Sequence, residues 1–193
     1  MGSDQHAVHE TLGLAWVESM GGPLVVVPVS ALHQWGGCTE NGMVAGGGDQ
    51  PDDYDRACEV EGLAEVISLS GHSTAAALVL GDEPSSTYYL AEQRAFVRWL
   101  AADSDAELIA AAQAVLNDPA TPWEDCGVWR TDGPAVLMDS GEAGSSLGVP
   151  YPDGRGQPEQ APVHVPAGHW RVRVFHDWSR ESTWVGVVQL LPA

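Results

Sequence analysis

The amino-acid sequence predicts an α+β domain that is mainly antiparallel β-sheet, with one amphipathic helix at about residues 104–117 packed on a sheet face. Three observations support this fold class. Short apolar or alternating segments recur between turns rich in glycine and proline. One segment has a clear helical period. Hydrophobic residues make up 44% of the chain, which contains eight tryptophans, so we expect a sizeable core.

The length of the chain, 193 residues, suits one domain. The first residues are polar and match no strand or helix pattern. We therefore expect residues 1–12 to form a flexible lead-in and residues 13–193 to form a single domain. No stretch inside the second range has the character of a domain linker, because predicted strands flank every loop.

The first predicted elements are two strands. Residues 16–18 and 24–27 are apolar enough to form strands, and Gly21, Gly22 and Pro23 between them predict a tight turn. Glycine supplies the positive φ that such a turn requires, and proline ends strand pairing on one side.

The middle of the chain contains weaker signals. Residues 30–35 predict one helical turn, and residues 54–60 are compatible with either a short helix or a strand. Residues 75–80 are continuously apolar, which is typical of a strand buried on both faces. Residues 94–100 alternate in polarity, which predicts a half-buried strand with Arg98 on its solvent side.

The helix at residues 104–117 has the strongest local signals. Ser104 and Glu107 have the spacing of a capping box, and Pro119 follows the end of the pattern. One apolar stripe recurs at helical spacing and predicts the buried face. The stripe consists of Leu108, Ile109, Ala112, Val115 and Leu116.

Two hairpins are predicted after the helix. Residues 127–130 and 135–138 predict strands joined by a hairpin turn at Asp132 and Gly133. Trp170, Val172 and Val174 alternate with arginines and predict a half-buried strand. Residues 184–191 are apolar on both faces, so we expect a central strand, joined to the previous one by a hairpin loop at residues 176–181.

The charge of the chain is strongly acidic. Eight basic residues, all of them arginine, oppose 27 acidic ones, which gives a net charge of −19. This field repels nucleic acid and anionic membranes and attracts cationic partners within a Debye length of about 8 Å. We therefore predict that the chain binds neither nucleic acid nor a membrane.

Composition also predicts the compartment. Three cysteines without a CxxC pair are typical of a reducing environment rather than of a disulfide framework. No apolar run reaches the roughly 20 residues that span a bilayer, and the N-terminal residues lack the pattern of a signal peptide. These features predict a cytoplasmic protein.

The sequence contains no recognisable catalytic, cofactor or metal motif, so we predict none of these sites. The histidines at 164, 169 and 176 do not have zinc-site spacing, and we expect them on the surface. The acidic residues between 49 and 55 lack the glycine and glutamate of an EF-hand. No serine lies in a GxSxG motif. Apart from Arg56 near Cys58, no basic residue adjoins the cysteines at 38, 58 and 126, and we expect all three to be buried.

The order of six short motifs resembles the immunity protein 21 family. The motifs are Trp16-Val17-Glu18-Ser19, Gly21-Gly22-Pro23-Leu24, Trp35-Gly36-Gly37, Asp53-Tyr54-Asp55-Arg56-Ala57-Cys58, Leu80-Gly81-Asp82-Glu83-Pro84 and Val97-Arg98-Trp99. The resemblance covers residues 14–140 and continues more weakly in the predicted hairpin at 170–191, and the chain departs from it at residues 42–48 and 140–161. It implies an immunity protein of a bacterial polymorphic toxin system, made beside a toxin that it neutralises in the cytoplasm. It implies no catalytic residue.

The resemblance and the charge together predict how the chain acts. We expect it to occlude the active site or an essential surface of a cognate toxin, for which a basic toxin is best suited. An acidic segment with one aromatic residue is the candidate contact, because carboxylates attract and an aromatic ring anchors. Its residues are Asp49, Asp52, Asp53, Tyr54, Asp55 and Glu59.

Three alternatives remain open on the sequence. Asp55 and Arg56 could instead fasten a turn to the core. The aromatic anchor of the contact with a partner would then be a tryptophan near a turn, namely Trp123, Trp129 or Trp178. Trp99, Trp170 and Trp184 are predicted to lie in the core. The chain could also be a carboxylate-dependent hydrolase or a small-ligand-binding domain, or a scaffolding module without a toxin.

Overall fold

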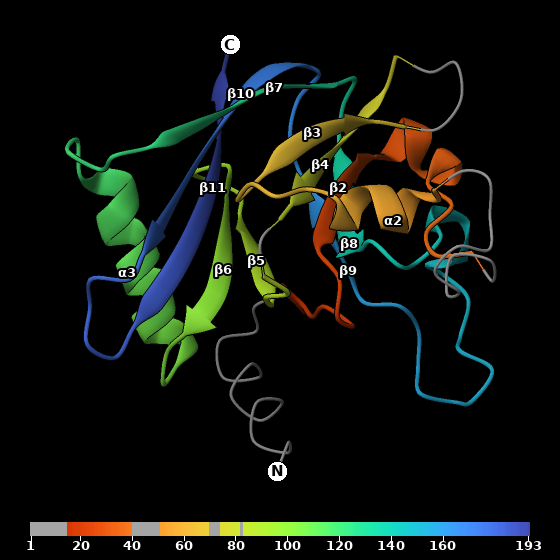
Figure 1. Ribbon diagram of the computed structural model, residues 1–193, viewed down its shortest axis with the longest axis horizontal. Helices are drawn as coiled ribbons and strands as arrows, with labels where there is room; N and C mark the ends of the chain where they lie inside the picture. The colour runs from red at the N-terminus through yellow and green to blue at the C-terminus, as the bar shows by residue number, and fades with distance from the viewer. Residues whose placement is uncertain (1–14, 40–50, 70–73, 82) are drawn as a thin grey trace.

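The computed structural model describes residues 15–39, 51–69, 74–81 and 83–193, which form two antiparallel β-sheets (Figure 1). The prediction of a mainly antiparallel β-sheet fold is confirmed, and the described residues contain a second, short α-helix besides the predicted one. One sheet has the order β1-β5-β6-β11-β10-β7 and the other β3-β4-β2-β8-β9.

The strand bounds are as follows. The six-stranded sheet contains β1 (Trp16–Val17), β5 (Thr87–Leu90), β6 (Ala95–Ala101), β7 (Glu124–Thr131), β10 (Gly168–Asp177) and β11 (Trp184–Pro192). The five-stranded sheet contains β2 (Leu24–Pro28), β3 (Glu65–Ser68), β4 (Ala76–Leu80), β8 (Ala135–Asp139) and β9 (Gln160–Val163).

The main core lies between the two sheets. On β10, Trp170, Val172 and Val174 are buried and alternate with more exposed residues, as the sequence pattern predicts. Val188 of β11 lies opposite Val174 in the antiparallel register and belongs to the same core cluster. β11 lies between β6 and β10, which confirms that it is a central strand.

Helix α3 (Asp105–Asn117) lies on the outer face of the six-stranded sheet (Figure 1). The Ser104 side chain accepts a hydrogen bond of 3.3 Å from the Glu107 backbone N–H and so caps the helix. One apolar cluster contains Leu108 and Val115 of the helix together with Val97 of β6 and Val187 of β11, among others. Ala111, outside the predicted stripe, is also buried, whereas Ile109 and Leu116 are only partly buried.

Three short helices cover the outer face of the five-stranded sheet. They are the 3₁₀ helices η1 (Val29–Gln34) and η2 (Gly144–Ser146) and the α-helix α2 (Asp53–Cys58), so the ambiguous segment at 54–60 is largely helical. Trp35 is buried here, and its indole N–H donates a hydrogen bond of 3.0 Å to the Ser140 carbonyl oxygen. At Gly144 a Cβ would lie 2.0 Å from the Leu32 carbonyl oxygen, so only glycine permits this approach.

At two predicted turns the chain passes from the six-stranded sheet to the five-stranded sheet instead of forming a hairpin. β1 and β2 both exist, but β1 pairs with β5 whereas β2 pairs with β4 and β8. The predicted hairpin turn at Asp132 and Gly133 is wrong for the same reason, because β7 pairs with β10 and β8 pairs with β2 and β9. A proline opens or precedes the second strand at both corners and cannot donate to a hairpin ladder. The Pro23 and Pro134 carbonyls instead accept from the Ser140 and Val29 N–H groups, respectively.

Several polar and aromatic residues differ from prediction. Arg98 is 1% exposed between the sheets, not on the solvent side of β6, because its guanidinium donates to the Gly81 and Glu83 carbonyl oxygens. His176 is buried at the end of β10, although it was expected on the surface. Trp184 is 40% exposed rather than in the core, and Trp129 is fully buried rather than near the surface.

Candidate partner-binding surface

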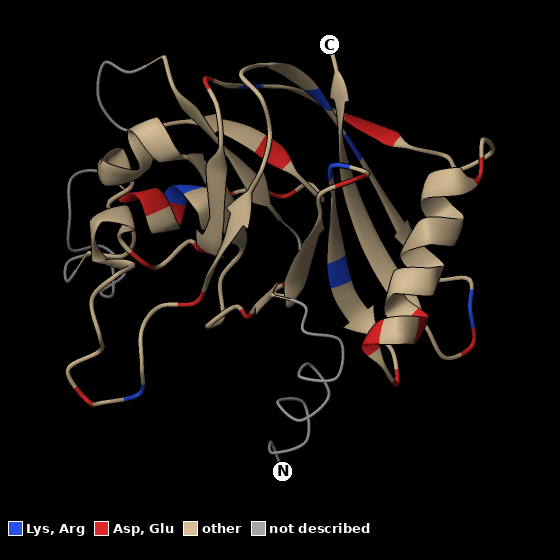
Figure 2. Cartoon of the chain, turned by 180° about the vertical axis from the view of Figure 1, so that it is seen from behind, with Lys and Arg blue, Asp and Glu red and all other residues tan. Residues whose placement is uncertain are grey.

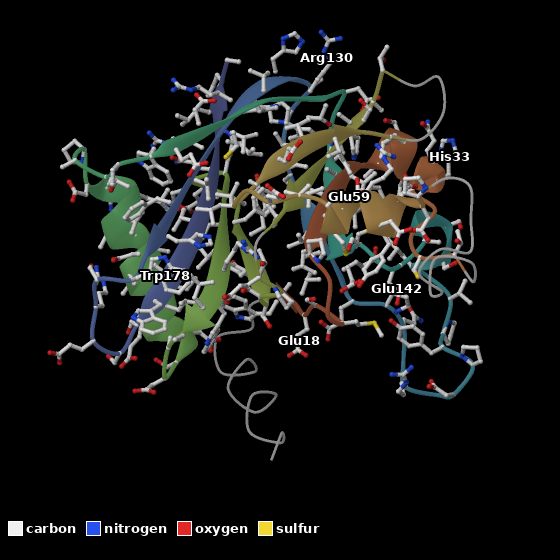
Figure 3. The ribbon with its side chains drawn as sticks, in the orientation of Figure 1. Glu18, His33, Glu59, Arg130, Glu142 and Trp178 are labelled. Atoms are coloured by element: carbon white, nitrogen blue, oxygen red, sulfur yellow. The ribbon has the colours of Figure 1, made fainter. Side chains whose placement is uncertain are left out.

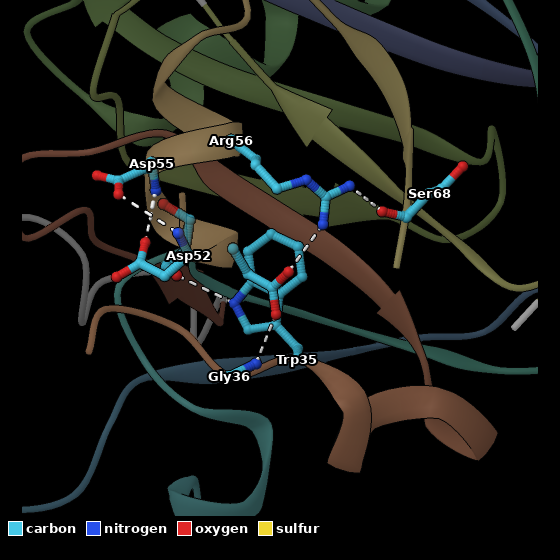
Figure 4. Close-up of polar contacts among 8 residues, drawn as sticks. Trp35, Gly36, Asp52, Asp55, Arg56 and Ser68 are labelled. Carbon is cyan, nitrogen blue, oxygen red and sulfur yellow. Dashed lines mark hydrogen bonds and ion pairs between the residues drawn. The ribbon is translucent and has the colours of Figure 1, made fainter. Parts of the chain in front are cut away.

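The acidic segment begins with a capping box at α2 (Figure 4). Asp52 is the N-cap residue, and its Oδ1 accepts a hydrogen bond of 2.8 Å from the Asp55 N–H. The Asp55 carboxylate accepts in return from the Asp52 N–H, and Asp52 Oδ2 accepts from the Thr39 N–H at 2.8 Å. Burial raises the pKa of Asp52, but the hydrogen bonds from Thr39 and Asp55 outweigh it and hold that pKa below its ordinary value.

Asp53 fastens α2 to the neighbouring segments. Its side chain is 4% exposed, and Oδ2 accepts a hydrogen bond of 2.7 Å from the Gly36 N–H. Oδ1 forms an ion pair of 2.9 Å with Arg56, which also donates to the Ser68 carbonyl oxygen at the end of β3. Asp53, rather than Asp55, therefore pairs with Arg56 to fasten this segment to the core.

Tyr54 points away from these contacts toward the start of β2. At Gly22 a Cβ would lie 2.5 Å from Tyr54 Cε2, so the ring occupies the space that any other residue at 22 would fill. Interaction of the Tyr54 hydroxyl with the Cys58 side chain, together with burial, raises the pKa of Tyr54 to about 12. Tyr54 is thus a neutral, half-buried ring held in one position.

A pocket of about 300 Å³ lies beside Tyr54. It is formed where the end of β8, the β1–β2 corner and α2 meet. We call it the Asp139 pocket, and its lining residues are Met20, Gly22, Cys38, Tyr54, Asp139, Gly141 and Glu142.

Two carboxyl groups line this pocket. Asp139 is 5% exposed and accepts hydrogen bonds of 2.7 Å from the Met20 N–H and 2.8 Å from the Gly141 N–H. Burial outweighs these bonds and raises the pKa of Asp139 above its ordinary value. Glu142 is half-buried and accepts a hydrogen bond of 2.6 Å from the Tyr151 hydroxyl.

The predicted contact residues therefore have different surroundings. Asp49 lies outside the described residues. Asp52 and Asp55 are partly buried in the capping box, Asp53 is buried, and Glu59 is exposed. Figure 2 shows the acidic residues of α2 beside one basic residue. Of the predicted residues that the structure describes, only Tyr54 lines the pocket, where it joins carboxyl groups from a distant part of the chain.

The sequence analysis missed the Asp139 pocket. Asp139 and Met20 are 119 positions apart and meet only because β2 and β8 are neighbours in the five-stranded sheet. The one available local signal was the Asp139-Ser140-Gly141 sequence after an apolar run, where an aspartate caps the end of a strand.

Of the alternative aromatic anchors, Trp129 is fully buried, and Trp123 and Trp178 lie on the side of the molecule that carries α3. Trp178 and Trp184, at the tip of the β10–β11 hairpin, are 48% and 40% exposed and stack edge to face with centroids 5.4 Å apart. Figure 3 shows Trp178 on the α3 side of the molecule and Glu59 and Glu142 on the α2 side. Trp123 is half-buried, with the Arg173 guanidinium 4.2 Å from its ring centroid.

The cysteines are free rather than uniformly buried. Cys58 is exposed, and Cys38 and Cys126 are half-buried, so the expectation that all three are buried is wrong. Burial raises the pKa of Cys126 to about 11, which makes it a weak nucleophile at neutral pH. Among the described residues, no group of three or more His, Cys, Asp or Glu side chains is arranged to hold a metal ion. No helix in the same ranges is long and apolar enough to cross a membrane.

The described residues thus form two antiparallel β-sheets with a short acidic helix beside a small pocket that two carboxyl groups line. The chain belongs to the immunity protein 21 family, whose model matches residues 15–183. No curated protein and no solved structure gives a significant match to it.

Proposed function

We propose that this chain is a cytoplasmic immunity protein that binds and neutralises a cognate bacterial toxin by occluding its active site or an essential surface. The family match over residues 15–183 carries this proposal. The proposed contact surface, which we call the α2 surface, consists of α2 and the adjoining Asp139 pocket. It comprises Asp52, Tyr54, Asp55, Glu59, Asp139 and Glu142. Asp49 stays in the proposal on the sequence alone.

Charge and the fixed position of an aromatic ring contribute to binding in different ways at this surface. A net charge of −19 speeds association with a basic toxin, because the carboxylates attract it before contact. Tyr54 is held in one position by Gly22 and Cys58, so it contacts a partner with little loss of side-chain entropy. Asp53 is left out of the contact surface because its buried carboxylate already binds Gly36 and Arg56.

A second candidate function is small-ligand binding or hydrolysis that depends on a carboxylate pair. The observation that favours it is the presence of Asp139 and Glu142 in one pocket. Against it, a volume of about 300 Å³ is at the lower limit of pockets that hold drug-sized ligands. The family also provides no catalytic residue to place there.

The test is protection from a toxin. A bacterial strain would express the toxin encoded beside this gene, with or without the chain, and growth would be measured together with the binding rates of the purified proteins. We expect the wild-type chain to restore growth. A chain that neither protects nor binds would contradict the proposed function.

Two aromatic variants locate the contact surface. Tyr54→Ala should speed dissociation by about tenfold or more, because a buried anchor contributes mainly to the lifetime of a complex. Trp178→Ala is the matched control, since it removes an exposed ring from the other side of the molecule. If only the Trp178 variant dissociates faster, the contact lies at the β10–β11 hairpin and the α2 surface is not used.

A further inference from the structure

The Asp139 pocket contains acidic groups that form no ion pair with an arginine among the residues that the structure describes. All eight basic residues of the sequence are arginines, and all eight lie within the described ranges. The ion pairs that the structure gives there use Asp53, Asp125, Asp153 and Asp177. Neither Asp139 nor Glu142 forms an ion pair with any arginine in the described part of the chain. Residues 40–50, which follow Cys38 in the sequence, contain no basic residue.

Asp139 retains hydrogen-bonding capacity. Its Oδ2 accepts from the Met20 N–H and its Oδ1 accepts from the Gly141 N–H. A carboxylate has about four lone-pair sites, so these bonds leave capacity for a donor inside the pocket. An added donor with a positive charge would also offset the cost of burying this carboxylate.

The walls of the pocket suit a long, partly apolar side chain. The Tyr54 ring forms one wall, and Met20, which is 63% exposed, lies at the pocket with its sulfur 3.7 Å from the Tyr151 hydroxyl. Gly22 and Gly141 keep the walls thin, because a Cβ at 141 would approach Asp139 Oδ1 to 3.1 Å. The pocket therefore combines an aromatic face and a thioether with acceptors from Asp139 and Glu142.

We propose that the Asp139 pocket receives one arginine side chain of the toxin, a deepening that rests on the proposed function above. The guanidinium would donate to Asp139 and Glu142 while its plane and aliphatic stem lie against Tyr54 and Met20. Arginine fits better than lysine, since its planar fork reaches two acceptors and stacks on an aromatic ring. A volume of about 300 Å³ accommodates a side chain rather than a large substrate.

The first experiment uses the toxin encoded by the neighbouring gene and measures binding to Glu142→Gln. This substitution removes the charge and keeps an oxygen that can accept from Tyr151. Affinity should fall by about tenfold to hundredfold, the usual effect of losing a charged hydrogen bond. Glu181→Gln is the matched control, because Glu181 is exposed on the distant β10–β11 hairpin loop, and it should change affinity less than twofold. Equal affinities for the wild type and Glu142→Gln would overturn the arginine pocket.

The second experiment does not need the toxin. N-acetylarginine amide would be titrated against the full chain, with N-acetylcitrulline amide as an isosteric neutral control, while the Met20 methyl resonance is followed by NMR. We expect saturable shifts at millimolar concentrations with the arginine probe alone, and their loss in Glu142→Gln. Equal responses to the two probes, or none, would overturn the proposal.

These outcomes separate the pocket from the function. A wild-type chain that protects against the toxin while Glu142→Gln binds it equally well retains the immunity function without the arginine pocket. A wild-type chain that neither binds nor protects overturns the function, and the arginine and citrulline probes still test the chemistry of the pocket.

Discussion

The two α-helices in the described part of the chain are held by different forces. α3 has 13 residues and contributes apolar side chains to a cluster on the six-stranded sheet. α2 has only six residues, too few for a stable isolated helix, and is fastened by the carboxylates of Asp52 and Asp53. The spacing of an apolar stripe thus predicts a buried helix face from the sequence alone. The sequence does not show whether an acidic residue stabilises the fold or lies on a binding surface.

The largest expected effect lies in α3. Leu108 is fully buried against the sheet, so Leu108→Ala should lower the free energy of unfolding by about 2–5 kcal/mol, through lost transfer energy and a cavity. Leu116 is only partly buried near the end of the same helix, and Leu116→Ala should cost less than half as much. Urea denaturation measures both. Equal losses would mean that the two leucines contribute equally to the buried face.

A smaller loss is expected at α2. Asp53→Asn removes the charge that pairs with Arg56 and weakens the acceptor for the Gly36 N–H, so we expect a loss of about 1.5–3 kcal/mol. Asp55→Asn is the matched control in the same helix. It affects only the hydrogen bond that the Asp55 carboxylate accepts from the Asp52 N–H, so we expect the free energy of unfolding to fall by about 1 kcal/mol or less. If Asp53→Asn is as stable as the wild type, carboxylate fastening does not hold α2.

An element could be predicted from the sequence where its signal is local, and could not where its position depends on distant residues. α3, β10 and β11 were predicted because a period of 3.6 or 2 residues is a local property that burial imposes. The sequence could not show whether β1 pairs with β2, or β7 with β8. A hairpin turn and a turn that leads into the other sheet contain the same glycine and proline residues. The identity of the neighbouring strand is fixed by partners far away in the sequence, such as β5 for β1.

The candidate surface was harder to predict for a related reason. The sequence predicted Tyr54 as a contact residue, and Tyr54 lies beside a pocket, but the pocket's carboxyl groups come from residues more than 80 positions later. Nor could the sequence distinguish Asp53 from Asp52 and Asp55. Their different burial depends on which carboxylate faces the Gly36 N–H once α2 docks.

The smallest expected effect compares two carboxyl groups of the α2 surface, Asp52 and Asp139. Hydrogen bonds outweigh burial at Asp52 and lower its pKa, whereas burial outweighs hydrogen bonds at Asp139 and raises its pKa. Carbon-detected NMR titration of the side-chain carboxyls should therefore give a midpoint below about 3.9, the unfolded reference, for Asp52 and above it for Asp139.

These two pKa shifts have opposite consequences for stability. The contribution of Asp139 is complete below about pH 3.9, where the group is protonated in both states, and is lost as the pH rises through its folded pKa. The contribution of Asp52 is present above about pH 3.9 and is lost as the pH falls through its folded pKa.

Relative to the wild type, Asp139→Asn should thus gain stability as the pH rises from about 3.9 through the folded pKa of Asp139. Asp52→Asn should recover part of its deficit as the pH falls below about 3.9. Urea denaturation across this pH range measures both trends, and parallel profiles for the two variants would show that the carboxyl groups of the capping box and the pocket have the same electrostatic environment.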